Sequence, residues 1–341
     1  MMSLLNAGKW IGLVFIVALS FSFMHNASTT RYVVHAQEPE DTTTVFLPLV
    51  FSSNPFQQAP ELPTTVTDLN GEVVTIRSTE RIIGLNGDIT EIIFALGMGD
   101  NVVAADISAT YPPAAVELPK IGYQRGLDAE AIINFAPTVV LGQESAGPAA
   151  VLVQLREAGL TLALTDDPPD LTAPAKKIRF VAQALGVPQR GEVLVEQLEA
   201  DLATVDAALA GVSGPKPRVI FLYLRQGDEG NVRLVFGDNT PTNAMIERAG
   251  GIDAAADIGI EGFFQPITAE ALIAAQPDII LVFTSGLAEI GGEDALLALP
   301  GIAQTPAGQA RRILAMDGEY LAAMTPRTGK ALLDMVEFFY P

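Results

Sequence analysis

Residues 128–141, DAEAIINFAPTVVL, recur in the second half of the chain as TAEALIAAQPDIIL at 268–281. Each copy begins with a residue able to cap a helix and places a glutamate, Glu130 or Glu270, in the first turn, where the helix dipole favours an anion. A proline then ends the helix before an apolar run typical of a buried strand. The repeat therefore predicts two copies of one α/β unit.

The sequence around both copies alternates short β-rich runs with helical patterns, which indicates mainly parallel sheets. Between 174 and 211 the apolar residues instead recur at helical spacing, and a long helix is expected at about 189–210. We therefore predict an α/β fold of two Rossmann-like lobes with mainly parallel sheets, joined by one long bridging helix. The predicted domains are an N-terminal lobe at 63–173, a bridging helix region at 174–211 and a C-terminal lobe at 212–341. Strands are expected at 81–85, 102–105, 138–142, 161–165, 218–223, 278–283 and 313–316, and helices at 90–96, 148–158 and 241–249.

The first 36 residues are typical of an export signal or anchor. They contain Lys9 and Arg31 but no acid, and their apolar run is short for a membrane span. Small residues ending at Ala36 suggest cleavage there, although an uncleaved anchor stays open. Residues 37–62 are polar and contain proline, so we interpret them as a tether. These features predict an extracytoplasmic protein, periplasmic or on the cell surface.

Composition excludes several classes of function. A formal charge of -20 disfavours a nucleic-acid partner, and the absence of cysteine excludes disulfides and thiolate sites. Both histidines, His25 and His35, lie in the export segment. A cleaved chain would lack the usual general base and the commonest metal ligand, so a serine hydrolase triad is excluded. We predict no enzymatic activity, and we expect a monomer.

Two loops contain candidate binding residues. The turn at 84–91, with Asn86 before a predicted helix, is placed to present backbone amides to a ligand, although a plain tight turn has the same sequence. A second loop follows the strand at 102–105, at the edge where open α/β sheets bind ligands, and contains Tyr111 before two prolines. Loop packing is the alternative role for this tyrosine.

Several motifs resemble the hemin-binding periplasmic proteins of bacterial ABC importers. In the first half they are Tyr111 with GYQR at 122–125, LGQESAGP at 141–148 and QLREAG at 154–159. In the second half they are RAGG at 248–251, LPGIAQTPAG at 299–308 and PRT at 326–328. The resemblance spans roughly residues 66–340.

This resemblance implies that heme, the transported ligand, lies between the lobes with its ferric iron coordinated by the Tyr111 phenolate. A nearby guanidinium would favour the phenolate, and Arg125 is the first candidate for this role or for pairing with a propionate. A chain without histidine is expected to hold one five-coordinate heme, with Phe263 and Phe264 covering its open face. Gln265 stands where related proteins carry a basic residue, so Arg225 and Arg327 are candidate substitutes.

The resemblance also implies that Glu130 and Glu270 dock onto the two permease subunits of an importer, which works with its ATPase. Cobalamin or a ferric siderophore is the closest alternative ligand. An extracytoplasmic α/β enzyme and a purely adhesive surface protein are alternatives from other classes.

Overall fold

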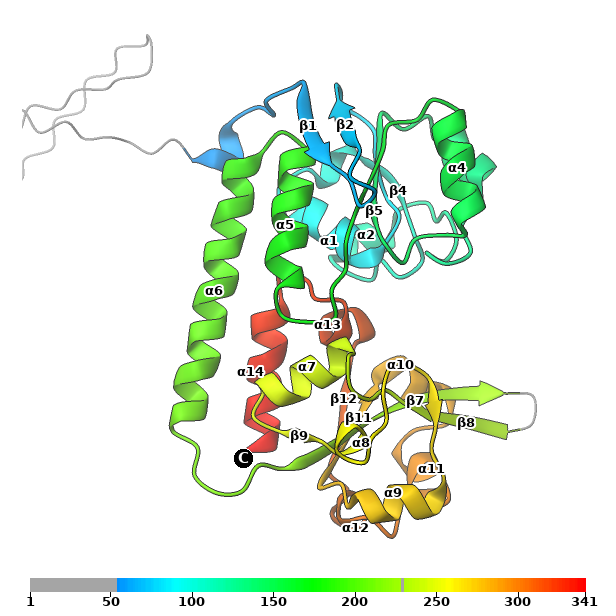
Figure 1. Ribbon diagram of the computed structural model, residues 1–341, viewed down its shortest axis with the longest axis vertical. Coiled ribbons are helices and arrows are strands. Elements are labelled where there is room, and N and C mark those ends of the chain that lie inside the picture. Colours follow the sequence, from blue (N-terminus) through cyan, green and yellow to red (C-terminus); the bar gives the residue numbers. More distant parts are fainter. Residues whose placement is uncertain (1–53, 228–229) are drawn as a thin grey trace, which may run out of the picture. The chain divides into compact units, whose positions relative to one another are not determined.

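The computed structural model describes residues 54–227 and 230–341 (Figure 1). The predicted export segment at 1–36, and the tether as far as residue 53, lie outside the described residues. No helix in the described part of the chain is long and apolar enough to cross a membrane.

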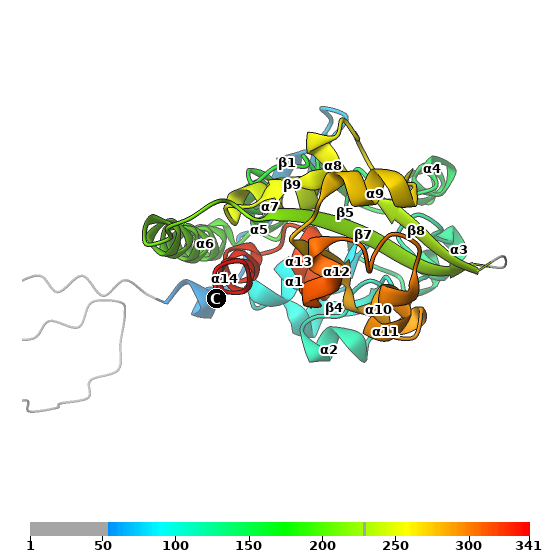
Figure 2. The same ribbon diagram turned by 90° about the horizontal axis from the view of Figure 1, so that it is seen from below.

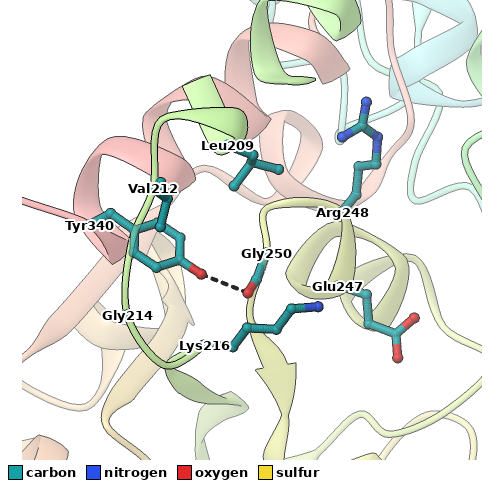
Figure 3. Close-up of a pocket in the computed structure, with 8 residues that line it drawn as sticks. All are labelled: Leu209, Val212, Gly214, Lys216, Glu247, Arg248, Gly250 and Tyr340. Atoms are coloured by element: carbon teal, nitrogen blue, oxygen red, sulfur yellow. Dashed lines mark hydrogen bonds between the residues drawn. The ribbon is translucent and has the colours of Figure 1, made fainter. Parts of the chain in front are cut away.

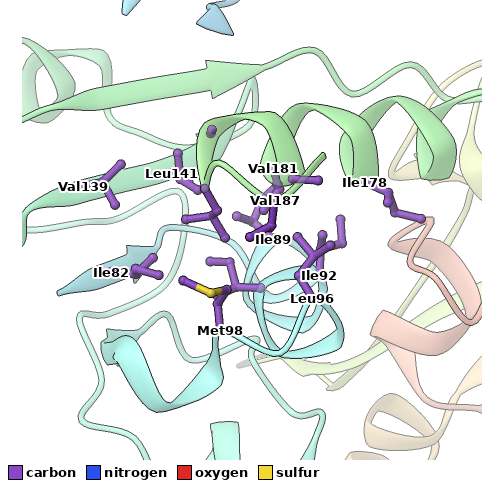
Figure 4. Packing of buried hydrophobic residues seen from close by; sticks show 14 of the residues in the cluster. Ile82, Ile89, Ile92, Leu96, Met98, Val139, Leu141, Ile178, Val181 and Val187 are labelled. Carbon is purple, nitrogen blue, oxygen red and sulfur yellow. The ribbon is translucent and has the colours of Figure 1, made fainter. Parts of the chain in front are cut away.

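The first sheet contains four parallel strands in the order β4-β3-β5-β6. Alternate residues of each strand face opposite sides, so Ile82 and Val139 pack with α1 and α5, whereas Ile83 and Val140 pack with α3 and α4. Figure 4 shows the first of these two clusters, in which Ile89 and Ile92 of α1, and Leu96 directly after it, meet Ile178 and Val181 of α5. The elements are β3 (Ile82–Gly84), α1 (Gly87–Ala95), β4 (Val102–Ala105), α2 (Pro113–Val116), α3 (Ala129–Asn134), β5 (Val139–Gln143), α4 (Ala149–Glu157), β6 (Leu162–Thr165) and α5 (Ala173–Ala184).

The second sheet is mixed, with the order β10-β8-β7-β11-β12, and β9 pairs with β7. Its central strands alternate in the same way, since Phe221 and Leu281 pack on one face and Ile220 and Ile280 on the other. The elements are β7 (Arg218–Gly227), β8 (Gly230–Val235), α7 (Pro241–Arg248), β9 (Ile252–Asp253), α8 (Ala254–Asp257), β10 (Gln265–Pro266), α9 (Ala269–Ala275), β11 (Ile279–Phe283), α10 (Thr284–Glu289), α11 (Glu293–Ala298), α12 (Pro306–Ala310), β12 (Ile313–Met316), α13 (Gly318–Ala322) and α14 (Thr328–Phe339).

The helix α6 (Pro188–Ala210) connects the two sheets in sequence and packs against α5 and α14. Both views show α6 and α14 side by side (Figures 1 and 2). The predicted fold class is confirmed: two sheets are each covered by helices, and the first is wholly parallel.

The strands β1, β2 and β8 were missing from the sequence prediction. The hairpin of β1 (Thr64–Thr67) and β2 (Val73–Ile76) precedes the first sheet, and β8 folds back on β7 as an antiparallel partner. Two short 3-10 helices, η1 (Pro55–Gln57) and η2 (Gly99–Asn101), complete the described elements.

Candidate functional site

The loops at the carboxyl ends of the two sheets meet at Arg327. This residue precedes α14 in the C-terminal half, yet its Nε and Nη2 donate to both carboxylate oxygens of Glu91 on α1, at 2.9 and 2.6 Å. Its guanidinium carbon also lies 3.8 Å from the ring centroid of Tyr111 and 4.9 Å from that of Tyr320. A cation from one half of the protein thus lies against a tyrosine ring of the other.

Tyr111 lies in the loop between β4 and α2, and its side chain is 43% exposed. Its ring is one of two exposed phenols in this region, because Tyr123 is 46% exposed in the loop that runs beside the end of β4. Arg125 follows Tyr123 by two residues and is also exposed. Within the described residues its side chain has no hydrogen-bonding or ion-pair partner. Tyr123 was not selected from the sequence, although it belongs to the GYQR motif.

Asn86 connects the loops around these phenols. Its side-chain amide donates to Gln124 Oε1 and to Ser145 Oγ (3.1 Å for the latter), and its Oδ1 accepts from the backbone N–H of Gln143 at 3.0 Å. The residue is fully buried, so in this conformation it has no exposed surface for a ligand contact. We therefore revise its predicted role from ligand contact to positioning of the loop that carries Tyr123 and Arg125.

A cluster of aromatic side chains lies at the corresponding edge of the second sheet. Phe264 packs edge-on against Tyr223 and against Phe236, with centroids 5.0 and 4.9 Å apart, and Phe263 lies 5.1 Å from Phe236. Both Phe263 and Phe264 remain partly exposed. They form an apolar surface backed by rings on β7 and after β8.

Gln265 and Arg225 border this aromatic group. Gln265 is exposed, and its side-chain amide donates to the backbone oxygen of Phe263 at 3.1 Å. Arg225 is exposed two residues after Tyr223 on β7, so their side chains leave the same face of the strand. Of the predicted arginines, the structure brings Arg327 to Tyr111.

The two glutamates of the repeat are both exposed in the first turns of α3 and α9. The caps form as predicted: Asp128 accepts from the Ala131 amide at 2.9 Å and Thr268 from the Ala271 amide at 3.1 Å. Among the described residues, neither Glu130 nor Glu270 has an ion-pair partner. Their carboxylates are available to a partner protein.

A buried charged group lies between the halves and was missed from the sequence. Lys177 Nζ contacts Asp88 at 2.6 Å and Asp167 at 3.1 Å, and donates to the backbone oxygen of Ala323 at 2.6 Å. Burial would lower the pKa of Lys177, but the two carboxylates outweigh it and raise that pKa. The lysine sits on the apolar face of α5, four residues before Val181, and this position is the one local signal of its burial.

Further acids surround this group. Burial raises the pKa of Glu319 well above its ordinary value, and the charges of Asp88 and Asp106 add to this effect. Burial likewise raises the pKa of Asp106 to about 6. No group of three or more metal-binding side chains in the described residues has the geometry to hold a metal ion.

Two surface pockets lie elsewhere. One, of about 340 Å³, lies at the end of α6, where Tyr340 donates to the backbone oxygen of Gly250 at 2.8 Å and Lys216 and Arg248 line the wall (Figure 3). The other, of about 390 Å³, includes Arg77 and Met98. None of the predicted site residues lines either pocket.

A family model described as periplasmic binding protein matches residues 82–320, well over half of the chain. The chain belongs to the periplasmic binding protein family. Members are binding proteins rather than enzymes, which confirms the prediction of no enzymatic activity.

Relatives of this periplasmic binding protein include solved and curated examples. The apo structure of the periplasmic heme-binding protein RhuT from Roseiflexus sp. RS-1 is 56% identical, with a TM-score of 0.74, and the match covers 77% of this chain and 98% of that one. An uncharacterized ABC transporter substrate-binding lipoprotein, YvrC of Bacillus subtilis (strain 168), is 27% identical over 84% of this chain and 88% of its own length. A vitamin B12-binding protein of Vibrio parahaemolyticus serotype O3:K6 (strain RIMD 2210633) is 26% identical, covering 86% and 95% respectively.

These similarities confirm the predicted family. They also indicate an extracytoplasmic location, because the relatives are periplasmic binding proteins and a transporter lipoprotein.

Proposed function

We propose that this periplasmic binding protein captures heme between its two lobes and delivers it to an ABC importer. The observation that carries the proposal is the pair of exposed phenols, Tyr111 and Tyr123, with the guanidinium of Arg327 from the opposite half against the first. The exposed rings of Phe263 and Phe264 add an apolar surface in the C-terminal half. A phenolate is a known axial ligand of ferric heme, and aromatic side chains suit the porphyrin face. The 56% identity with a heme-binding protein supports the same ligand.

Tyr111 is the proposed iron ligand. The positive charge of Arg327 lies 3.8 Å from its ring centroid and would stabilise the phenolate that coordination creates. Tyr123 is the competing phenol, because Arg125 stands two residues away without another partner among the described residues. In this competing arrangement Arg125 stabilises the phenolate, whereas with Tyr111 as ligand it is free to pair with a propionate.

The opposite face of the heme is proposed to meet Phe263 and Phe264. Gln265 would then lie at the rim, where it offers an amide and no charge, and Arg225 on β7 is the proposed propionate partner of that side. Since a chain cleaved after Ala36 contains no histidine, we propose a single five-coordinate heme.

Absorption spectroscopy of the purified protein with hemin tests the assignment. We expect a Soret band and a charge-transfer band typical of tyrosinate-ligated ferric heme, saturating at one equivalent. Hydroxocobalamin and a ferric siderophore are the comparison ligands, because a vitamin B12-binding protein is among the relatives. Tighter binding of either, with no hemin spectrum, would replace heme as the ligand.

Delivery is proposed to occur through Glu130 and Glu270, each docking on one permease subunit. Their exposure and matching positions in the two copies of the repeat support this role. Export through the N-terminal segment, with cleavage after Ala36, is proposed from the sequence, and the intact mass of the secreted protein tests it.

A further inference from the structure

The helices that carry the two proposed docking glutamates are anchored at their other ends in the same way. Each is short, with six residues in α3 and seven in α9. Helices of this length are not stable in isolation, so their direction depends on contacts at their ends. After each helix one non-glycine residue adopts the left-handed conformation, Ala136 with φ 45° and Gln276 with φ 47°. These residues occupy the same position of the repeat.

An arginine binds backbone carbonyl oxygens at the end of each helix. Arg81, just before β3, donates from Nε to the backbone oxygens of Phe135 and Ala136 at 3.0 and 3.1 Å, and from Nη2 to Phe135 O at 2.5 Å. Arg218, the first residue of β7, donates from Nε to the backbone oxygen of Ala275 at 2.8 Å. Phe135 and Ala275 again occupy the same position of the repeat.

The backbone groups of these two arginines also make equivalent hydrogen bonds in the two lobes. Arg81 O accepts from the Thr138 amide at 2.8 Å, and Arg218 O accepts from the Asp278 amide at 2.7 Å. The side chains of Thr138 and Asp278 in turn accept from the backbone N–H of Arg81 and Arg218, at 3.1 and 2.8 Å. Each docking helix is therefore joined, through one arginine, to the first parallel strand of its own sheet.

We propose that Arg81 and Arg218 are positioning residues that orient the docking glutamates of the two lobes. A helix ends with carbonyl groups that lack intrahelical partners, and a guanidinium there satisfies them and complements the dipole. Because the last turn is fixed to the sheet, the helix axis has a fixed direction. The glutamate in the first turn is then held in one orientation. This inference rests on the proposed docking role of Glu130 and Glu270.

Arg218 and Arg81 differ in the other contacts that hold their helices. Arg218 also pairs with Asp257 at 2.8 Å, and α9 is held near its start by Arg233, which donates to the backbone oxygens of Ile267 and Pro300. Arg81 has no acidic partner among the described residues. We therefore expect the larger effect from Arg81→Gln.

The test is ATP hydrolysis by the heme importer reconstituted in nanodiscs, measured against the concentration of heme-loaded full-length protein. For Arg81→Gln we expect the half-saturating concentration to rise roughly threefold to tenfold while the maximal rate is unchanged. Arg81→Lys should recover part of the loss. Arg179→Gln is the matched control, because it removes an exposed arginine and its pair with Glu192 on other helices. Soret titrations verify that each variant binds hemin as the wild type does.

A double-mutant cycle separates positioning from general stability. If Arg81 acts through Glu130, Arg81→Gln should have no further effect on half-saturation in a Glu130→Gln background. A full additional effect there, or unchanged half-saturation in Arg81→Gln alone, would overturn the positioning role and leave docking intact. If Glu130→Gln and Glu270→Gln both leave half-saturation unchanged, the docking role itself is wrong, and the positioning role is wrong with it.

Discussion

Lys177 is a charged residue in a fully buried position. It is fully buried, with one carboxylate at 2.6 Å, a second at 3.1 Å and a backbone oxygen of the C-terminal half. Removing one partner of a buried pair leaves an uncompensated charge, which costs about 3–5 kcal/mol. We expect Lys177→Met to lower the free energy of unfolding by that amount.

Urea denaturation measures this loss, and the neighbouring lysine provides the control. Lys176 is about half exposed and reaches Asp166 at 3.7 Å, so Lys176→Met should change stability by less than about 1 kcal/mol. Equal effects of the two substitutions would show that the buried network contributes no more than a surface pair.

Asp106 gives a pH dependence at the residue scale. It is fully buried, its Oδ2 accepts from the Ser108 amide and hydroxyl, and its Oδ1 has no partner within the described residues. Burial raises its pKa to about 6. The folded state therefore holds this proton more tightly than the unfolded chain, and the stabilisation is complete below about pH 4 and lost as pH rises through about 6.

Asp106→Asn should remove this contribution, of about 3 kcal/mol, from the pH dependence. Unfolding free energies measured between pH 4 and 7 should fall less steeply for the variant than for the wild type. Asp88 and Glu319, whose pKa values burial also raises, keep a residual slope of the same sign in both proteins. Identical slopes would contradict a raised pKa for Asp106.

At the scale of elements, the close packing of α9 depends on Gly301. This glycine has φ 87°, and an added Cβ would lie 2.9 Å from both Cα and O of Ala269, next to Glu270. Gly259 has a similar φ of 81° with open space around it. Gly259→Ala is therefore expected to cost about 1 kcal/mol for the backbone alone, whereas Gly301→Ala adds overpacking and should cost about 2–4 kcal/mol.

Thermal unfolding of both glycine variants provides the comparison. Hydrogen exchange in peptides covering α9 should increase for Gly301→Ala alone. If both variants lose the same stability and α9 exchanges as in the wild type, the contact between Gly301 and Ala269 does not hold the helix.

Elements with a strong periodic pattern were predictable from sequence. The helix expected at about 189–210 corresponds to α6, and the strands of the repeat correspond to β5 and β11. The hairpin of β1 and β2 was missed, although its alternation of Thr and Val flanks a turn at 68–71. Both strands fall within the predicted N-terminal lobe at 63–173, in which the first strand was expected at 81–85.

The site was less predictable, since contacts far apart in sequence decide it. Tyr111 and Glu91 lie in the first half, and nothing local to Arg327 indicates that it will contact both. Asn86 was selected for its place before a helix, but its burial depends on Gln124 and Ser145 in other loops. Local motifs identified the loops of the site, whereas the contact partners of Arg327 and Asn86 became known only from the tertiary structure.

At the scale of the whole molecule, the proposed capture and delivery of the ligand depend on different residues. The proposed ligand residues lie at the carboxyl ends of both sheets, and Glu130 and Glu270 lie on helices that precede the central strands β5 and β11. Glu130→Gln and Glu270→Gln should therefore leave the hemin spectrum unchanged and lower heme uptake, with the double variant losing most of it. Heme-dependent growth measures uptake, and a changed Soret band in either variant would contradict the separation.

The central claim is that a phenolate of the N-terminal half binds ferric heme, and hemin titration of Tyr111→Phe and Tyr123→Phe tests it most directly. We expect Tyr111→Phe to abolish the tyrosinate charge-transfer band and to weaken binding at least tenfold, while Tyr123→Phe keeps the band. The reverse pattern would assign the iron to Tyr123 with Arg125. A wild-type charge-transfer band in both single variants and in the double variant would contradict phenolate ligation from this half.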